Sequence, residues 1–180
     1  MIVGAYAADP VIGSVARIDA GVSYVVFGRN YTNTQYYANI DLFPIIGAGS
    51  SVGFAIWGAA TGDTSGMSVG AAGDVNGDGI CDVIVGANQA DPIVNSVMRI
   101  NAGTAYIIFG RSVASGSSSY SNVDLLPLLS VASTLGIALI GTNPGDFTGY
   151  ACGGAGDVNG GGVSDVIVGA HQANRVVAGI

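Results

Sequence analysis

The stretch Gly73-Asp-Val-Asn-Gly-Asp-Gly-Ile-Cys-Asp-Val-Ile-Val-Gly-Ala87 decides the fold. Its first half alternates acidic or amide side chains with glycine, and its second half is a short β-branched run that ends at Gly86. The same pattern returns at residues 156–170, and its tail alone opens the chain at residues 1–5. A motif that recurs this closely indicates a repeat protein.

The repeat has a period of 82 or 83 residues. Gly4, Gly86 and Gly169 recur at spacings of 82 and 83, and Phe27-Gly28-Arg29 returns 82 residues later as Phe109-Gly110-Arg111. We therefore expect residues 1–180 to form one repeat segment. Its units span about 1–82, about 83–165 and a partial unit 166–180.

The composition favours strands over helices. Every acidic residue is Asp and every basic residue is Arg, so Glu and Lys, which favour exposed helices, are absent from the sequence. The formal net charge of −7 at pH 7 argues against a nucleic-acid partner and against an anionic membrane surface. The most apolar region, Leu125–Ile140, is broken by Pro127 and Gly136, so we expect no direct membrane insertion. Two cysteines, Cys81 and Cys152, are too few for a disulfide scaffold, and we expect both to be unpaired.

Each period is expected to contain four strands. In the complete period these are Val83–Ala87, Gly103–Gly110, Leu135–Ile140 and Gly149–Gly154. A polar excursion at 88–101 and a longer insertion at 111–134 separate them, and both have copies in the preceding period. In the insertion, residues 122–129 predict one or two helical turns capped by Asn122 or Asp124.

Four antiparallel strands in every repeat predict an all-β fold built of β-propeller blades. A sandwich would not repeat its own sequence in this way, and the coils of a parallel β-helix would be shorter. The chain holds about two and a quarter blades, so we expect an incomplete propeller.

The Asp-rich loop followed by Val-Ile-Val-Gly-Ala resembles the FG-GAP repeat of integrin α-subunit propellers and of related bacterial and eukaryotic surface proteins. The chain departs from that pattern at two landmarks. The Phe-Gly pair is Ser65-Gly66 and Thr148-Gly149, and the proline after Gly-Ala is replaced by Tyr6, Asn88 or His171. Complete propellers of this family have seven blades, so the resemblance also implies a partial propeller.

The loop at residues 74–82 predicts a calcium site. Its side chains alternate and can converge when Gly77 and Gly79 let the backbone curl, and hard oxygen ligands at this spacing suit Ca²⁺. The alternative is an Asx turn that holds no metal. The expected ligands are the side chains of Asp74, Asn76, Asp78 and Asp82 and the carbonyl of Ile80.

The loop at residues 157–165 predicts a second, weaker calcium site. Its expected ligands are Asp157, Asn159 and Asp165, with the carbonyl of Val163, whereas Gly161 lacks the ligand that Asp78 supplies in the first loop. An EF-hand would need a Glu at loop position twelve, which is Val85 in one copy and Val168 in the other.

We expect no catalytic residues and therefore a protein that is not an enzyme. His171 is the only histidine and has no partnered geometry in the sequence. Asp63 and Asp146 occupy matching Gly-Asp-x-x-Gly turns, and Arg29 and Arg111 end equivalent strands, where they predict surface or inter-blade contacts. Asn30-Tyr31-Thr32 is an N-glycosylation sequon, which fits a surface glycoprotein.

The resemblance to integrin α subunits implies adhesion or protein recognition by an extracellular or cell-surface protein that binds Ca²⁺. Its partner would be a protein ligand or a partner subunit. Two alternatives remain open. The segment could be the accessory propeller of an extracellular enzyme, such as a hydrolase similar to glycosylphosphatidylinositol phospholipase D. It could also be a structural repeat of a bacterial surface protein.

Overall fold

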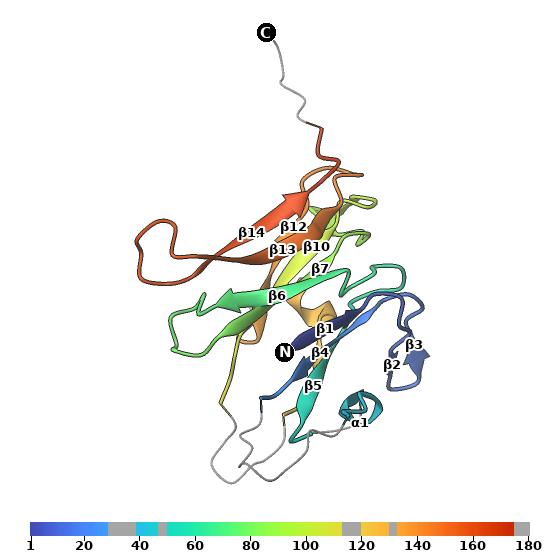
Figure 1. The fold of residues 1–180 in the computed structure, drawn as a ribbon. Coiled ribbons are helices and arrows are strands. Elements are labelled where there is room, and N and C mark those ends of the chain that lie inside the picture. The colour runs from blue at the N-terminus through green and yellow to red at the C-terminus, as the bar shows by residue number, and fades with distance from the viewer. Residues whose placement is uncertain (29–38, 47–49, 113–119, 130–132, 175–180) are drawn as a thin grey trace, which may run out of the picture.

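A computed structural model of the chain describes residues 1–28, 39–46, 50–112, 120–129 and 133–174. The described part is nearly all β, and its repeated sheets fit partial propeller blades. Two four-stranded sheets and a C-terminal hairpin are stacked in chain order (Figure 1). The all-β prediction from the sequence is thereby confirmed.

The second sheet is the most regular of the three layers. Its strands pair antiparallel in the order β12-β10-β7-β6. Each one matches a predicted strand to within two residues at both ends, and β6 matches 66–71, the copy of Gly149–Gly154 in the preceding period. The strands are β6 (Ser68–Gly73), β7 (Asp82–Ala87), β10 (Thr104–Ile108) and β12 (Gly136–Ile140).

The first sheet combines strands from two sequence periods. Its order is β1-β4-β5-β11, and the first three strands are antiparallel neighbours. The fourth strand comes from the second period and runs parallel to β5, with Val123 opposite Ile56. The strands are β1 (Ile2–Ala5), β4 (Val22–Val26), β5 (Gly53–Trp57) and β11 (Val123–Asp124).

The C-terminal hairpin consists of β13 (Thr148–Gly156) and β14 (Asp165–Ala170). The two strands pair antiparallel, with register shifts between Thr148 and Ala151 and between Gly154 and Gly156. By its place in the repeat this hairpin is the counterpart of β6 and β7.

Each polar excursion contains a short β-hairpin that was not among the four strands predicted for each period. The hairpins are β2 (Val11–Ile12) with β3 (Val15–Ala16), and β8 (Ile93–Val94) with β9 (Val97–Met98). In the second hairpin Asn95 and Ser96 both have positive φ, at 52° and 64°. Positive φ at both central residues is the geometry of the two-residue turn that matches strand twist. The hairpin was not predicted because its turn lacks the Asn-Gly or Asp-Gly pair that usually marks this geometry.

The predicted helical turns are present as α1 (Phe43–Ile46) and the 3₁₀ turn η1 (Leu126–Leu129). The Asp124 carboxylate accepts a hydrogen bond from the backbone N–H of Leu126 at 3.0 Å, so Asp124 is the cap. Asn122 has another role, because its side-chain oxygen accepts the N–H of Ala55 on β5 at 2.8 Å.

The insertion of the second period therefore lies against the first sheet. The Arg17 guanidinium donates to both carboxylate oxygens of Asp124, at 2.6 and 2.9 Å, and to the carbonyl of Gly58 at 2.7 Å. This bidentate pair joins residues that are 107 positions apart. It holds the insertion against the C-terminal end of β5, next to Gly58.

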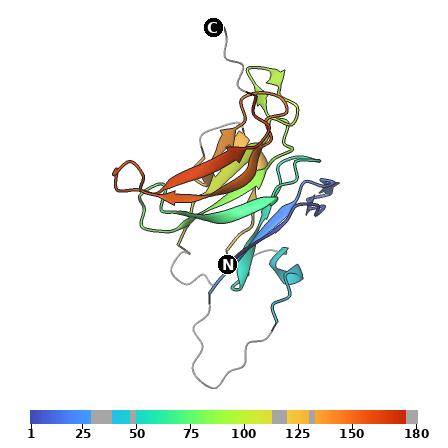
Figure 2. The same cartoon turned by 45° about the horizontal axis from the view of Figure 1, so that its top comes forward.

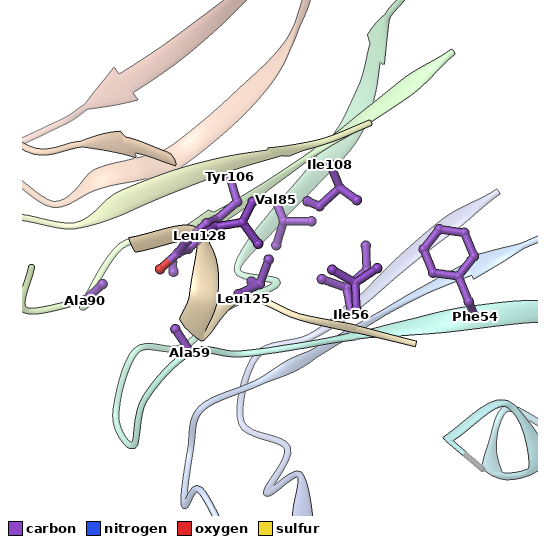
Figure 3. Packing of buried hydrophobic residues seen from close by; sticks show 11 residues of the cluster. Phe54, Ile56, Ala59, Val85, Ala90, Tyr106, Ile108, Leu125 and Leu128 are labelled. Atoms are coloured by element: carbon purple, nitrogen blue, oxygen red, sulfur yellow. The ribbon is translucent and has the colours of Figure 1, made fainter. Parts of the chain in front are cut away.

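Apolar side chains fill the space between the layers. Between the two sheets, Ile56, Val85 and Leu125 are fully buried, and the Tyr106 ring lies among them (Figure 3). Between the second sheet and the C-terminal hairpin, buried residues of β7 and β10 pack against β14. That second cluster includes Ile84, Ile107, Val166 and Val168.

In the first two of the three Val-Gly-Ala tails, the glycine lies where the next layer comes closest. A Cβ placed on Gly86 would lie 1.9 Å from the carbonyl oxygen of Gly149, and one on Gly4 would lie 2.0 Å from that of Gly66. Both contacts are with backbone, which cannot rotate away. Close approach of successive layers therefore requires glycine at this position of the repeat.

Candidate calcium-binding loops

The two Asp-rich loops are the turns of the β6–β7 and β13–β14 hairpins. Both extend on the same side of the stacked layers (Figures 1 and 2). They also touch, because the backbone N–H of Ser164 donates to the carbonyl of Asp74 at 2.8 Å. The repeat thus places two acidic loops next to each other on one rim.

In the first loop (residues 74–82), the Asp74 carboxylate organises the backbone. Its Oδ1 accepts the N–H groups of Gly77 and Asp78 at 2.7 and 3.1 Å, and its Oδ2 accepts that of Gly79 at 2.8 Å. Gly77 and Gly79 have φ of 77° and 84°, which is the curl that the sequence predicted. The Asp74 carboxylate therefore fixes the backbone of residues 77–79.

Asn76 and Asp78 converge on the same point. The Asn76 Oδ1 accepts the backbone N–H of Asp78 at 3.0 Å, and its Nδ2 donates to the Asp78 Oδ2 at 2.9 Å. The Asp78 Oδ1 in turn accepts the backbone N–H of Ile80 at 2.8 Å. Asp74 and Asn76 thus share the backbone N–H of Asp78, and the Asp78 carboxylate lies beside them through its bond to the Asn76 amide.

Asp82 anchors the loop to the second sheet. It is 1 % exposed, and its two carboxylate oxygens accept the N–H groups of Val75 at 2.8 Å and Gly110 at 2.7 Å. Gly110 lies just beyond β10, so this carboxylate joins the loop to a strand 28 residues away. From the sequence, Asp82 was expected only as a ligand, and this structural role was not predicted.

The first loop offers oxygen ligands of more than one chemical type. Within the described residues, no group of three or more His, Cys, Asp or Glu side chains is placed to hold a metal ion on its own. The set that fits a hard cation here includes the carboxylates of Asp74 and Asp78, the amide oxygen of Asn76 and the carbonyl of Ile80. In this structure the partner of the Asp78 carboxylate is the partially positive side-chain N–H of Asn76.

The second loop (residues 157–165) has the same plan with one donor fewer. The Asp157 Oδ1 accepts the N–H of Gly161 at 2.9 Å, and its Oδ2 accepts that of Gly162 at 2.8 Å. Asp165 accepts the N–H of Val158 at 2.8 Å and the side-chain amide of Asn159 at 3.1 Å. Val163, the predicted carbonyl donor, is exposed.

The charged form of Asp157 is favoured by this geometry. Hydrogen bonds from the backbone N–H groups of Gly162 and Gly161, chiefly the former, lower the pKa of the Asp157 carboxyl. The second loop therefore keeps an ionised carboxylate at its first position. It lacks a third side-chain ligand, because residue 161 is glycine where the first loop has Asp78.

The other acidic residues highlighted by the sequence form turns, as predicted. The Asp63 carboxylate accepts the N–H of Ala60 at 3.0 Å, and Asp146 accepts that of Asn143 at 3.0 Å. Both Asp side chains are 5 % exposed. Burial raises the pKa of Asp63 to about 6, with a smaller increase from the nearby charge of Asp91.

The arginines divide into several roles. The Arg111 guanidinium lies 5.2 Å from the centroid of the Phe54 ring on the first sheet, which makes it an inter-blade contact. Arg29 and the sequon at Asn30 lie outside the described residues. The contact between Arg17 and Asp124, which joins two sequence repeats, was not predicted from the sequence. A signal for it existed, since Arg17 recurs 82 residues later as Arg99, which donates to the carbonyl of Gly141 at 2.9 Å.

His171 and the cysteines have ordinary surroundings. The His171 ring lies 4.1 Å from the ring of Tyr150, centroid to centroid, and 5.6 Å from that of Phe147. Cys81 and Cys152 are free thiols, and Cys152 bonds to Ser68 on β6 through its backbone N–H at 2.8 Å.

Comparison with known proteins identifies one part of the chain. Residues 65–108 match the family model of the FG-GAP repeat. The match includes β6, the first loop, β7 and β10, which is the region that carries the resemblance in the sequence. No curated protein sequence matches the chain significantly. Within the described residues, no helix is long and apolar enough to cross a membrane.

Proposed function

Because the chain carries an FG-GAP repeat at residues 65–108, we propose that it is a calcium-stabilised propeller segment of an extracellular or cell-surface protein. In this proposal the segment acts by recognising another protein, as integrin α subunits do, and performs no catalysis. The repeat itself supports the coarser statement of a propeller-type recognition or adhesion segment.

The observation that carries the calcium proposal is the cluster of Asp74, Asn76 and Asp78, in which the first two accept the backbone N–H of Asp78 and the Asn76 amide donates to the Asp78 carboxylate. Three oxygen-bearing side chains already point into a loop that positive-φ glycines hold open. A bound Ca²⁺ would supply a positive charge that neutralises neighbouring carboxylates. Asp82 would act mainly through the shape of the loop, since it is buried and joins the loop to Gly110 just beyond β10.

Contact between the two loops extends the effect of binding beyond one turn. Since Ser164 donates to the Asp74 carbonyl, ordering of the first loop also restrains the second. The cation would thus stabilise the packing of the second sheet on the C-terminal hairpin. Anything that binds the folded state in preference to the unfolded state raises the melting temperature.

Two short hairpins with exposed apolar side chains support the recognition role. The β2–β3 and β8–β9 hairpins present β-branched residues to solvent, with Val11 and Val15 at 61 % and 65 % exposure and Ile93 and Val97 at 64 % and 61 %. The β8–β9 hairpin follows the end of β7 that is remote from the calcium loop. Exposed apolar tips that repeat with the blades suit contact with a protein partner.

A calorimetric calcium titration of the full chain tests the proposal. We expect the first loop to bind more tightly than the second, and Asp78→Gly to lower the affinity of the first loop toward that of the second. Gly161→Asp should raise the affinity of the second loop, because each change removes or adds one carboxylate ligand. An unchanged affinity of the first loop in Asp78→Gly would show that the ligand assignment is wrong.

The structure defines the risk in the Gly161→Asp variant. The backbone φ of Gly161 lies outside the left-handed region, so a side chain there causes no backbone strain. A new Cβ would lie 2.5 Å from the Asn159 Oδ1, which is the end of a side chain and can rotate aside. Magnesium is the matched control ion, because Mg²⁺ demands a smaller and more regular shell. An equal stabilisation by Mg²⁺ would count against a calcium site.

A further inference from the structure

A pocket of about 220 Å³ lies between the first and second sheets, beside the first loop, whose Ile80 forms part of its wall. Phe54 on β5 and Ile108 on β10 contribute to it from the two sheets, and both lie in the space between them (Figure 3). Most of the residues that line the pocket are apolar or aromatic, and Arg111 is the one charged residue among them. The pocket therefore combines an apolar interior with a single positive charge.

Three aromatic rings form one wall of the pocket. The rings of Phe27 and Tyr120 lie 4.5 Å apart, centroid to centroid, and those of Phe54 and Tyr120 lie 6.0 Å apart with an angle of 20° between their planes. Phe27 and Phe54 are 6.1 Å apart. Aromatic rings attract one another in offset or edge-to-face arrangements at such distances. The wall therefore offers the same contacts to one further ring.

Arg111 is a half-buried cation without a carboxylate partner. All twelve acidic side chains of the sequence lie in the described parts of the chain, and none of them is within 4.0 Å of the Arg111 guanidinium. Among the described residues, the guanidinium donates one hydrogen bond, from Nη2 to the carbonyl of Ser121, and it lies against the Phe54 ring. Since a guanidinium has five N–H donors, most of them remain available to a ligand.

The charge of Arg111 favours an anionic ligand. Burial lowers the pKa of Arg111, against a smaller opposite effect of Tyr120, because desolvation disfavours the charged form. A buried charge costs free energy unless an opposite charge accompanies it, and a carboxylate can accept two parallel hydrogen bonds from one guanidinium. The volume limits the rest of the ligand. Since an apolar cavity of about 150 Å³ holds benzene, this pocket has room for one ring and a short carboxylate arm.

We propose that this pocket binds a small aromatic carboxylate that is free in solution. Its single ring packs against the aromatic wall, and its carboxylate accepts hydrogen bonds from the Arg111 guanidinium. Asp82 does not compete for Arg111, because its two oxygens accept the N–H groups of Val75 and Gly110. The site is separate from the proposed calcium ligands in its chemistry, since it takes an anion and they take a cation, and it does not rest on the proposed function.

The first experiment is a calorimetric titration of the full chain at one fixed calcium concentration. The probes are phenylacetate and phenylacetamide, which have the same shape but differ in charge. We expect the wild type to bind phenylacetate about 10- to 100-fold more tightly, because hydrogen bonds to charged groups are the stronger ones. Arg111→Gln should abolish this preference while phenylacetamide still binds, and Arg111→Lys should retain part of it. Arg99→Gln is the matched control, since it removes the same charge at the contact with Gly141 and should keep the preference.

The second experiment locates the bound ring by nuclear Overhauser effects between its protons and the methyl groups of the protein. Neighbouring residues of a strand point to opposite faces of the sheet. Val83 lies opposite Ile108 in the pairing of β7 with β10, and both line the pocket. Ile84 and Ile107 belong to the cluster beneath the C-terminal hairpin instead. We therefore expect contacts from phenylacetate to Val83 and Ile108 and none to Ile84 and Ile107.

Several results would overturn the proposal. Equal affinities of the wild type for the two probes, or no binding of phenylacetate at millimolar concentrations, would do so directly. A preference that survives in Arg111→Gln, or contacts to Ile84 in place of Val83, would place the ligand elsewhere. A peptide with a free C-terminal phenylalanine that binds at least tenfold more tightly than phenylacetate would assign the pocket to the end of a partner chain instead. If Arg111→Gln fails to fold, the two probes on the wild type and the methyl contacts decide alone.

Discussion

Replacing Gly86 with alanine tests whether close backbone approach is what requires glycine in the Val-Gly-Ala tail. The new Cβ would lie 1.9 Å from the Gly149 carbonyl oxygen, far inside the 3.4 Å at which ordinary contact begins. The clash joins backbone to backbone, so β7 and β13 must move apart rather than a side chain turn. We expect this separation to disturb the apolar cluster between the second sheet and the hairpin.

The expected cost follows from that geometry. Forcing extra atoms into a packed interior costs about 1–3 kcal/mol, and opening the cluster around Ile84 adds lost burial. We therefore expect Gly86→Ala to lower the free energy of unfolding by about 3 kcal/mol or more. Gly153→Ala adds its methyl to open space, and by restricting the unfolded chain it should change stability by about 1 kcal/mol or less.

Urea denaturation followed by the fluorescence of Trp57, the single tryptophan, measures the difference. With a urea dependence of about 1–3 kcal/mol per molar, a loss of about 3 kcal/mol moves the midpoint by about 1–3 M. All variants are compared at one protein concentration. Equal midpoints for Gly86→Ala and Gly153→Ala would refute the argument that layer spacing selects the glycine.

Four further substitutions test three other features of the fold. Arg17→Gln and Asp124→Asn should each lower the unfolding free energy by about 1–3 kcal/mol, and a double-mutant cycle should return a coupling of about 1–2 kcal/mol for their bidentate pair. Because burial raises the pKa of Asp63 from 3.8 to about 6, its contribution to stability is full below pH 4 and is lost as the pH rises through 6. The difference in unfolding free energy between wild type and Asp63→Asn should therefore change by about 2–3 kcal/mol over that range, and a flat difference would contradict the raised pKa. Leu125→Ala, at a fully buried site between the two sheets, should cost about 2–5 kcal/mol by the same denaturation assay.

The regular strands were predictable because each carries a local apolar pattern that the repeat presents twice. The strands that escaped prediction have no such pattern. β11 consists of Val123 and Asp124 alone and is a strand only because β5 of the other period lies beside it. The β8–β9 hairpin depends on positive φ at Asn95 and Ser96. Their residue types allow this conformation but do not by themselves predict it.

The positions of the candidate site could be predicted, but the roles of its side chains could not. The alternating acidic and amide residues with intervening glycines predicted the curl around Asp74, and the structure has it. Asp82 was indistinguishable from the other acidic residues in sequence. Its role depends on Gly110, which reaches it only through the pairing of β7 with β10. Long-range pairing of this kind leaves no trace in the local sequence.

The unit of structure in this chain is therefore shifted relative to the unit of sequence. The second period supplies β7, β10 and β12 of the second sheet, whereas β6 comes from the first period. The insertion of the second period also supplies β11, η1 and Asp124, which holds Arg17 of the first period. Leu125 and Leu128 of the same insertion complete the core between the two sheets. A cut at the sequence period would remove these residues from the first sheet and expose its core. The stability of each blade therefore depends on the repeat that follows it, and neighbouring repeats should unfold together rather than one by one.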